Sequence, residues 1–564
     1  MIHASRLTIA GSVLALALLA AGCGGGEKKS ATTTTEAGGK GGTMTTVANA
    51  APSGSPDPAI NYTLQEWQFL IMTHDGLTAF KRVGGKGGTE LVPDLAEAIP
   101  KPTDGGKTYT FTLRKNIKFA DGTVVKPSDF TRTFERMFKL HGPTTGTFYN
   151  VLVGADACLK NAATCDLSQG VVADDSANTV TFHLTTGDPE WLFKLGLPFA
   201  FVLPKSTPDK EVNIPPAGTG PYKFAEYNPN KQIKLVRNTY FKEWSKDAQP
   251  EGNPDVILQK FGLSAEAETT QVQNGQADWT FDLPPADRLP EISEKYADQV
   301  HINPLTAIHY IAMNVRIPPF NNLKARQAVN YATDHNALVK IYGGPKLAQP
   351  TCQILPPNFP GYQPYCPYTK NPGSGKWTAP DMAKAQQLMT ESGVKGQEVS
   401  VVTDTIEQDK SYGLYFVDLL NQLGFKAKLK ALSPDLQYPY CQNSKNKVQF
   451  CWSTWYQDYP AASDFINVLL GCDSYNPNSN ASPNIAEYCV KSTQDKIDQA
   501  LQKGITDPTA ANKQWAQIDK LLVDQAVWVP MFNPKLIDFV STRVKGYQFS
   551  PQWYFLLDQA SVEG

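Results

Sequence analysis

The chain has 564 residues, of which 41% are hydrophobic, 10% aromatic and 19% charged, a composition typical of folded globular proteins. Its 52 Lys and Arg residues almost balance 54 Asp and Glu residues, which leaves a net charge of −2. A near-neutral chain has no overall electrostatic attraction for nucleic acid, so we expect no nucleic-acid partner. The 42 Gly and 42 Pro residues argue against coiled coils and helical repeats.

The first 22 residues have the pattern of a secretory signal peptide. Arg6 precedes an apolar run over residues 7–20, and the small residues Ala21 and Gly22 follow. The run is too short for a transmembrane helix, which needs about 20 apolar residues. We therefore expect export of a mature chain that begins near Cys23.

Cys23 follows Leu19-Ala20-Ala21-Gly22, a segment that resembles the lipobox of bacterial lipoproteins. The resemblance implies that Cys23 is diacylated and becomes the mature amino terminus. A free thiol in an ordinary secreted protein is the alternative. Residues 23–58 are rich in Gly, Thr, Ser and Ala, so we expect a lipid anchor followed by a flexible linker that packs against no core.

The other eight cysteines are an even number in a chain that we expect to be exported, which favours disulfides. Eight cysteines allow 105 connectivities, and short loop closure favours pairs that are near in sequence. The alternative is a metal site, but no C-x₂-C spacing occurs. The expected disulfide cysteines are Cys158 with Cys165, Cys352 with Cys366, Cys441 with Cys451, and Cys472 with Cys489.

Hydrophobic periodicity predicts helices and strands that alternate along the rest of the chain. The expected helices cover residues 127–138, 322–342, 381–391 and 413–423. The expected strands cover residues 108–113, 180–184, 425–432 and 528–540, and a further strand begins at residue 450 and ends in a loop. Repeated helix–Gly–strand units predict an α/β fold in two regions, separated near residue 305.

The sequence carries no recognisable catalytic motif. Gly106-Lys107-Thr108 looks like the end of a P-loop, but Lys101 stands where the first Gly is required. The zinc-protease, nucleophile-elbow and EF-hand patterns do not occur. We therefore expect a protein that is not an enzyme and that has no cofactor or metal.

Seven segments together resemble family 5 of the bacterial extracellular solute-binding proteins, the oligopeptide and dipeptide type. The resemblance spans about residues 60–560. The segments are Leu91–Glu97, Tyr109–Thr123, Gly218–Tyr222, Pro318–Phe320, Arg326–Asp334, Leu355–Pro357 and Trp455–Tyr459.

This resemblance implies an α/β, two-lobed periplasmic-binding-protein-like fold of type II, with an extra subdomain beside lobe I. Lobe I would comprise residues 59–90, 196–308 and 525–564. The extension would cover residues 91–195, and lobe II residues 309–524. It also implies a monomer that delivers solute to the permease of an ABC importer. The location would be the cell envelope, lipid-anchored at the outer face of the cytoplasmic membrane or in the periplasmic space.

The segment from Trp455 to Tyr459 contains a single carboxylate, Asp458, among aromatic side chains. A peptide cleft needs an anion for the ligand's α-ammonium, and charge-assisted hydrogen bonds are strong. In peptide-binding relatives the Asp of a matching Trp-x-x-Asp segment holds that ammonium. The resemblance therefore implies that Asp458, Trp455 and Tyr459 contact ligand, and it places Tyr149 among ligand-facing tyrosines. A turn-capping Asp458 and a buried Tyr149 are the alternatives.

Three functions are compatible with these observations. The first is a peptide receptor for an ABC importer. The second is the same receptor for an oligosaccharide, an opine or a metal chelate. The third is an exported hydrolase or a structural lipoprotein, which the absence of nucleophile and metal motifs disfavours.

Overall fold

The computed structural model describes residues 39–285, 287–480 and 482–563 and confirms the α/β class. The expected signal peptide, residues 1–22, and the expected lipidation site, Cys23, lie outside these residues. Among the helices of the described residues, none combines the length and apolar character that a membrane span requires.

The first sheet has five strands in the order β10-β1-β9-β8-β7. Strand β1 runs parallel to β9 and β10, whereas β8 runs antiparallel to both of its neighbours. The strands are β1 (Thr43–Ala48), β7 (Tyr222–Asn228), β8 (Gln232–Arg237), β9 (Val256–Phe261) and β10 (Trp279–Thr280).

Strand β1 corrects the expected linker. Residues 23–58 were expected to pack against no core, yet residues 43–48 form an internal strand, and Met44 and Val47 are fully buried. The β-branched Thr and Val residues of this segment suit a strand. Its apolar positions are too few to stand out beside the Gly- and Thr-rich stretch that precedes them, and parallel pairing with distant β9 supplies the rest of the stabilisation.

A smaller antiparallel sheet, β4-β6-β5, lies within the expected extension, residues 91–195. Helix α2 packs on it with Phe130, Phe134, Met137 and Phe138 buried, as the spacing predicts. The elements are β4 (Thr108–Thr112), β5 (Val171–Asp174), β6 (Thr179–His183), α2 (Pro127–Lys139), α3 (Ala155–Lys160) and α4 (Trp191–Lys194).

The second large sheet has the order β11-β17-β12-β16-β14-β15, and β13 pairs with β17. Strand β14 is parallel to both β15 and β16. The strands are β11 (Val300–Pro304), β12 (Ala307–Met313), β13 (Ala348–Pro350), β14 (Glu398–Asp404), β15 (Lys426–Leu432), β16 (Phe450–Tyr456) and β17 (Trp528–Phe539).

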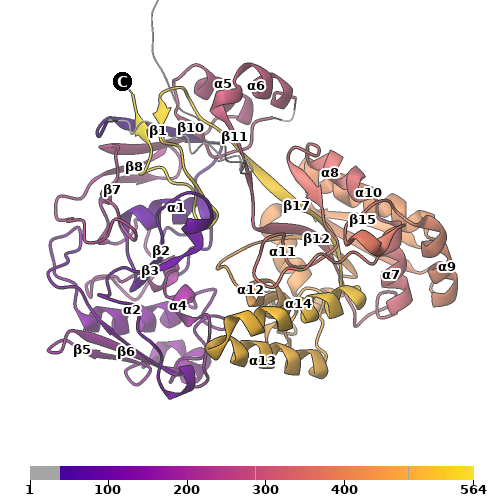
Figure 1. The fold of residues 1–564 in the computed structure, drawn as a ribbon, viewed down its shortest axis with the longest axis horizontal. Coiled ribbons are helices and arrows are strands. Elements are labelled where there is room, and N and C mark those ends of the chain that lie inside the picture. Colours follow the sequence, from indigo (N-terminus) through magenta and orange to yellow (C-terminus); the bar gives the residue numbers. More distant parts are fainter. Residues whose placement is uncertain (1–38, 286, 481, 564) are drawn as a thin grey trace, which may run out of the picture. The chain divides into compact units, whose positions relative to one another are not determined.

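Strand β17 lies in the second sheet and leads the chain back to the first. Its first half pairs with β12 of the second sheet and its last residues pair with β11, after which Val540 bridges to Trp279 of the first sheet. Figure 1 shows this yellow strand running from the orange elements toward the indigo and magenta ones. Residues 528–539 thus lie in the second sheet, and the bridge to the first sheet follows at Val540.

The helix expected over residues 322–342 is two helices. Helix α7 ends at Ala332, Thr333 is extended, and the Asp334 side chain accepts hydrogen bonds from the backbone N–H groups of Asn336 and Ala337. Asp is a favourable helix-capping residue, so it starts a new helix here. The two helices are α7 (Leu323–Ala332) and α8 (His335–Tyr342).

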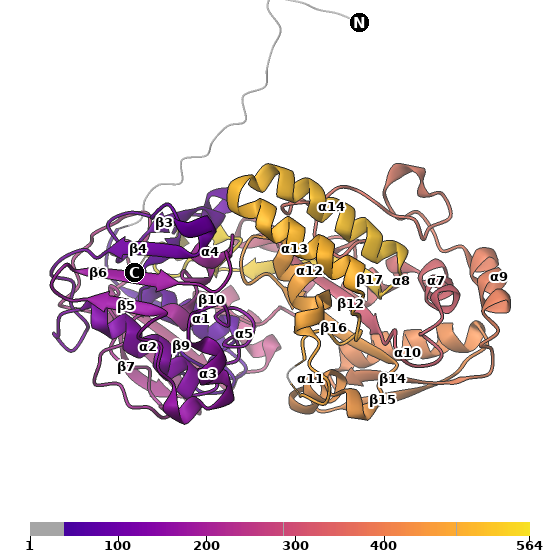
Figure 2. The same cartoon turned by 90° about the horizontal axis from the view of Figure 1, so that it is seen from below.

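The remaining elements complete the two regions, and Figure 2 shows α13 and α14 side by side. The helices are α1 (Leu64–Thr73), α5 (Ala265–Gln273), α6 (Leu289–Lys295), α9 (Met382–Ser392), α10 (Glu407–Gln422), α11 (Pro434–Gln442), α12 (Ala462–Leu470), α13 (Lys491–Thr506) and α14 (Pro508–Asp524). The short strands are β2 (Thr78–Phe80), β3 (Leu91–Pro93), β18 (Val544–Lys545), β19 (Phe549–Ser550), β20 (Tyr554–Phe555) and β21 (Ser561–Val562).

Four disulfides join the cysteine pairs that short loop closure predicts, which confirms that expectation. They link Cys158 to Cys165, Cys352 to Cys366, Cys441 to Cys451, and Cys472 to Cys489. The described residues contain no group of three or more His, Cys, Asp or Glu side chains that could hold a metal ion.

Candidate functional site

Strand β16 places the segment that the sequence singled out. It lies between β12 and β14, and Trp455 stands opposite Ile308 of β12. The strand ends at Tyr456, whose ring is 41% exposed, and the chain then turns so that Asp458 and Tyr459 are both buried. These side chains therefore lie at the carboxyl end of a central strand.

Asp458 is held by groups from two distant parts of the chain. Its carboxylate accepts a hydrogen bond of 2.5 Å from the hydroxyl of Tyr62, which lies just before α1. Its backbone carbonyl accepts a hydrogen bond of 2.7 Å from the Gln552 side chain near the carboxyl terminus. The side chain of Tyr62 packs edge-on to Phe199 and stacks on Trp67. Asp458 thus links the second region to the first.

A second carboxylate, Asp464 of α12, supports the Asp458 loop. Its side chain accepts a hydrogen bond of 3.0 Å from the backbone N–H of Asp458. Burial raises the pKa of Asp458 to about 7, although the Tyr62 hydrogen bond lowers it. Burial, and then the charge of Asp458, raise the pKa of Asp464 well above its ordinary value. Two buried carboxyls without a cation between them favour binding of a proton or another positive charge.

Tyr459 points into the extension rather than into open space. Its ring stacks on Phe193 and packs edge-on to Phe148, and the Lys194 ammonium lies 5.7 Å from its centroid. Lys194 forms a buried ion pair of 2.6 Å with Asp188. Tyr459 is 1% exposed, so it joins the loop after β16 to the aromatic side chains of Phe148 and Phe193.

A cavity of about 370 Å³ lies beside Tyr459, between the extension and the helices that follow β16. Asp188, Glu190 and Lys194 line it on the extension side, and Asp473 and Asp498 on the other. Glu190 is 6% exposed, and burial raises its pKa to about 7 in spite of Lys194. The cavity is of a size that suits a small ligand or a side chain.

The structure places the four predicted ligand residues differently. Asp458, Trp455 and Tyr459 lie together, and the Trp455 indole lies close enough to Asp464 to lower its pKa. Tyr149 is fully buried among aromatic rings, and its hydroxyl donates a 2.7 Å hydrogen bond to the Lys194 carbonyl. This placement agrees with the alternative of a buried Tyr149, and its contact with ligand stays a prediction.

Sequence reasoning missed Tyr62, Asp464, Glu190 and Lys194. Tyr62 falls in a segment without a motif and reaches Asp458 across 396 positions in sequence. The other three residues have no distinguishing spacing. Only the tertiary fold brings them together, so the sequence held no signal for them beyond their charge or hydroxyl.

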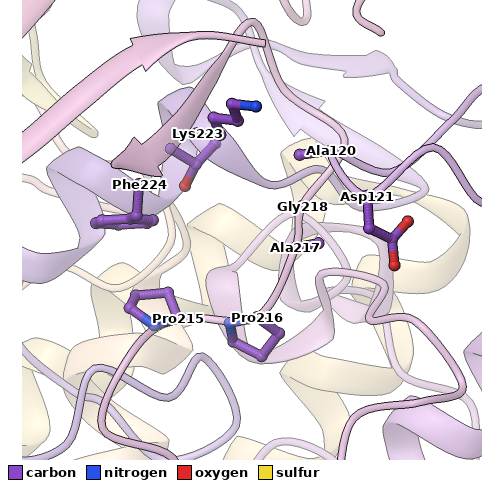
Figure 3. Close-up of a pocket in the computed structure, with 9 residues that line it drawn as sticks. Ala120, Asp121, Pro215, Pro216, Ala217, Gly218, Lys223 and Phe224 are labelled. Carbon is purple, nitrogen blue, oxygen red and sulfur yellow. The ribbon is translucent and has the colours of Figure 1, made fainter. Parts of the chain in front are cut away.

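A second pocket, of about 230 Å³, lies on the first region (Figure 3). Its wall consists largely of the turn at Asp121 and the segment Pro215–Gly218. At Gly218 a Cβ would come within 2.0 Å of the Thr73 carbonyl oxygen, so a close backbone approach requires glycine there. This agrees with a scaffold role for the Gly218 turn, and the pocket offers no group comparable to the buried Asp458.

Known proteins resemble the chain along most of its length. The family described as bacterial extracellular solute-binding proteins, family 5 Middle, matches residues 90–477. A di/tripeptide-binding protein of Pseudomonas aeruginosa is 25% identical, over 88% of this chain and 91% of the relative. A heme-binding protein A of Haemophilus influenzae is 26% identical, over 85% of each chain.

A solved structure, titled clavulanic acid biosynthesis oligopeptide binding protein 2, superposes with a TM-score of 0.83 at 23% identity. It covers 93% of this chain and 96% of the other. That likeness establishes the two-lobed type II fold. The family match extends over more than half of the sequence. The chain therefore belongs to family 5 of the bacterial extracellular solute-binding proteins.

Proposed function

We propose that the protein is the peptide receptor of an ABC importer and that it binds peptides at the junction of its two lobes. The observation that carries the proposal is the buried Asp458 carboxylate, which lies in the Trp-x-x-Asp segment and contacts Tyr62 of the opposite lobe. A peptide α-ammonium would replace the phenol as the partner of this carboxylate. Such a charge-assisted pair in a closed site is strong and directional.

Similarity to a di/tripeptide-binding protein supports a peptide ligand, and the heme-binding relative supports a metal chelate as the second candidate. The two are distinguished by charge, because Asp458 and Asp464 favour a positive group, whereas haem carries carboxylates. A peptide with a free amino terminus is therefore the better match to this site.

Closure of the lobes is the expected mechanism. The chain passes from the first sheet to the second between β10 and β11, and it returns after β17, where Val540 bridges to Trp279. Two crossings allow the lobes to rotate as rigid bodies about hinge segments. A ligand that contacts both lobes stabilises the closed form, and about 5.5 kcal/mol of differential affinity changes the ratio from 1:99 to 99:1.

The test is calorimetry with di- to tetrapeptides, their N-acetylated forms, a cello-oligosaccharide and haemin, on protein unfolded and refolded to remove bound ligand. Free peptides should bind, and acetylated ones should bind at least about a hundredfold more weakly, because they lack the ammonium. Binding of haemin or the oligosaccharide without any peptide would contradict the proposal.

We further propose that Cys23 is lipidated and holds the receptor at the outer face of the cytoplasmic membrane, near its permease. The support is the lipobox-like segment and the signal-like residues before it. More than one acyl chain is needed for stable anchoring. In a bacterial host that processes lipoproteins, Cys23→Ser should move the protein from the membrane to the soluble fraction. A variant that stays as membrane-bound as the parent would refute lipidation.

A further inference from the structure

The cavity beside Tyr459 has a strongly uneven charge. Asp188, Glu190, Asp473 and Asp498 contribute four carboxylates, and Lys194 is the cation among its lining residues. Lys194 is already neutralised by its 2.6 Å ion pair with Asp188. The remaining three carboxylates give the cavity a net negative charge, with exposed Asp473 and Asp498 on one side and buried Glu190 on the other.

The burial of Glu190 is a second, independent indication that the cavity takes a cation. Glu190 is 94% removed from solvent, it lines the cavity, and no hydrogen bond or ion pair with another described side chain is seen for its carboxylate. The nearby Ser463 hydroxyl lowers the pKa of Glu190 but has no hydrogen-bond partner. Lys194 lies near enough to lower the pKa of Glu190, but its ion pair is with Asp188. Buried carboxylates are normally paired, so Glu190 can take a cation of its own.

The geometry favours an organic cation over a metal ion. The described residues hold no cluster of three or more ligands suitable for a metal. A volume of about 370 Å³ exceeds what a bare ion needs and accommodates a long side chain. The apolar Leu501 and Val468 in the wall can cover the methylene groups of a lysine or arginine, whose charged ends then reach Glu190.

We propose that this cavity binds a cationic side chain of the peptide ligand, an ammonium or guanidinium group, with the Glu190 carboxylate as its counter-ion. The inference rests on the proposed peptide-binding function and adds a preference for basic peptides. Asp458 then serves the α-ammonium and Glu190 the side chain. The preference for basic peptides therefore comes from a different residue than the requirement for a free amino terminus.

The test compares matched tripeptides by calorimetry. Lys replaces each residue of Ala-Ala-Ala in turn, and norleucine, which keeps the methylene chain without the ammonium, replaces it in the controls. We expect a lysine tripeptide to bind the parent at least about tenfold more tightly than its norleucine match at one position or more. Glu190→Gln should bring that ratio below about threefold and leave the norleucine affinities nearly unchanged, which also reports correct folding.

Two further variants complete the experiment. Asp473→Asn with Asp498→Asn, both at exposed positions, should lower the ratio by about two- to fivefold, because screened charges contribute less. Glu211→Gln, an exposed glutamate outside the cavity lining, is the matched control and should leave the ratio unchanged.

The outcomes separate the two proposals. If tripeptides bind the parent but lysine and norleucine bind alike at every position, the basic preference is refuted and peptide binding stands. If the preference exists but survives Glu190→Gln, the assignment of the counter-ion is wrong. If no tripeptide binds the parent, the proposed function fails, and the inference fails with it.

Discussion

Asp458 and Glu190 are both buried, but their carboxyl groups have different neighbours. Both carboxyls are 6% exposed, and burial raises the pKa of each to about 7. Asp458 is held by the Tyr62 hydroxyl, whereas Glu190 faces a cavity with Lys194 as its charged neighbour. A buried carboxyl with a neutral donor can exchange it for a ligand, and one facing a cavity can accept a ligand without displacing anything. Asp458 therefore suits the α-ammonium, which all free peptides carry. Glu190 suits a basic side chain, which only some peptides carry.

Loss of the Lys194 ammonium should produce the largest effect on stability. The charges of Asp188 and Glu190 raise the pKa of Lys194, although burial alone would lower it. Lys194→Met leaves a buried carboxylate unpaired, so the free energy of unfolding should fall by about 3–5 kcal/mol at pH 8. The loss should be smaller at pH 5, where Glu190, whose pKa burial raises to about 7, is protonated. Denaturant unfolding measures both.

The matched control for that prediction is Lys491→Met. Lys491 pairs with Asp495 at 2.7 Å, but its side chain is 87% exposed, and such pairs contribute little. We expect no change in the free energy of unfolding beyond the error of the measurement. If the free energy of unfolding falls equally in the two variants, burial does not make the Lys194 ion pair more important than the Lys491 pair.

The affinity for a neutral peptide should depend on pH through Asp458. Its pKa of about 7 means that the free carboxyl is protonated below pH 7, whereas the ammonium-bound form must be ionised. Affinity for Ala-Ala-Ala should therefore rise about tenfold per pH unit between pH 5 and pH 6.5, and fall above about pH 8 as the α-amino group loses its proton. Calorimetry across this range tests the sign, and an affinity that falls from pH 5 to pH 7 would contradict it.

A smaller effect should follow from Tyr62→Phe. The Tyr62 hydrogen bond lowers the pKa of Asp458, so its removal should raise the midpoint of the pH profile by about one unit. The same substitution should leave the lysine-to-norleucine ratio unchanged, because Tyr62 does not line the Glu190 cavity. An unshifted midpoint would mean that the hydrogen bond is not made in solution.

Local sequence patterns predicted the elements that depend on local chemistry. The helix over residues 127–138, the strand that begins at Phe450 and the four disulfides agree with the structure. The patterns failed where long-range pairing decides. Strand β1 is stabilised by β9, and β17 pairs with β11 and β12; in each case the partner strand is more than 200 positions away. The break between α7 and α8 is a local feature. Asp334 is a favourable capping residue in the sequence, but residues 322–342 were predicted as one helix.

The candidate site follows the same division. Asp458 could be singled out because its Trp-x-x-Asp segment is contiguous, and its contact with ligand stays a prediction. The role of Tyr149 could not be decided from the sequence, because a tyrosine in a loop has the same sequence appearance whether it faces a ligand or the core. Glu190 has no motif, and only the fold brings it to the cavity.

The most direct measurement is a calorimetric comparison of the parent and Asp458→Asn, each with Ala-Ala-Ala and with its N-acetylated form at pH 7.5. Asp156→Asn, an exposed substitution on α3, is the control and should behave as the parent. Removal of the buried charge should weaken binding of the free peptide by about two to three orders of magnitude, and it should change the weak binding of the acetylated peptide little. Equal affinities of parent and variant for the free peptide would contradict the assignment of Asp458 as the ammonium partner.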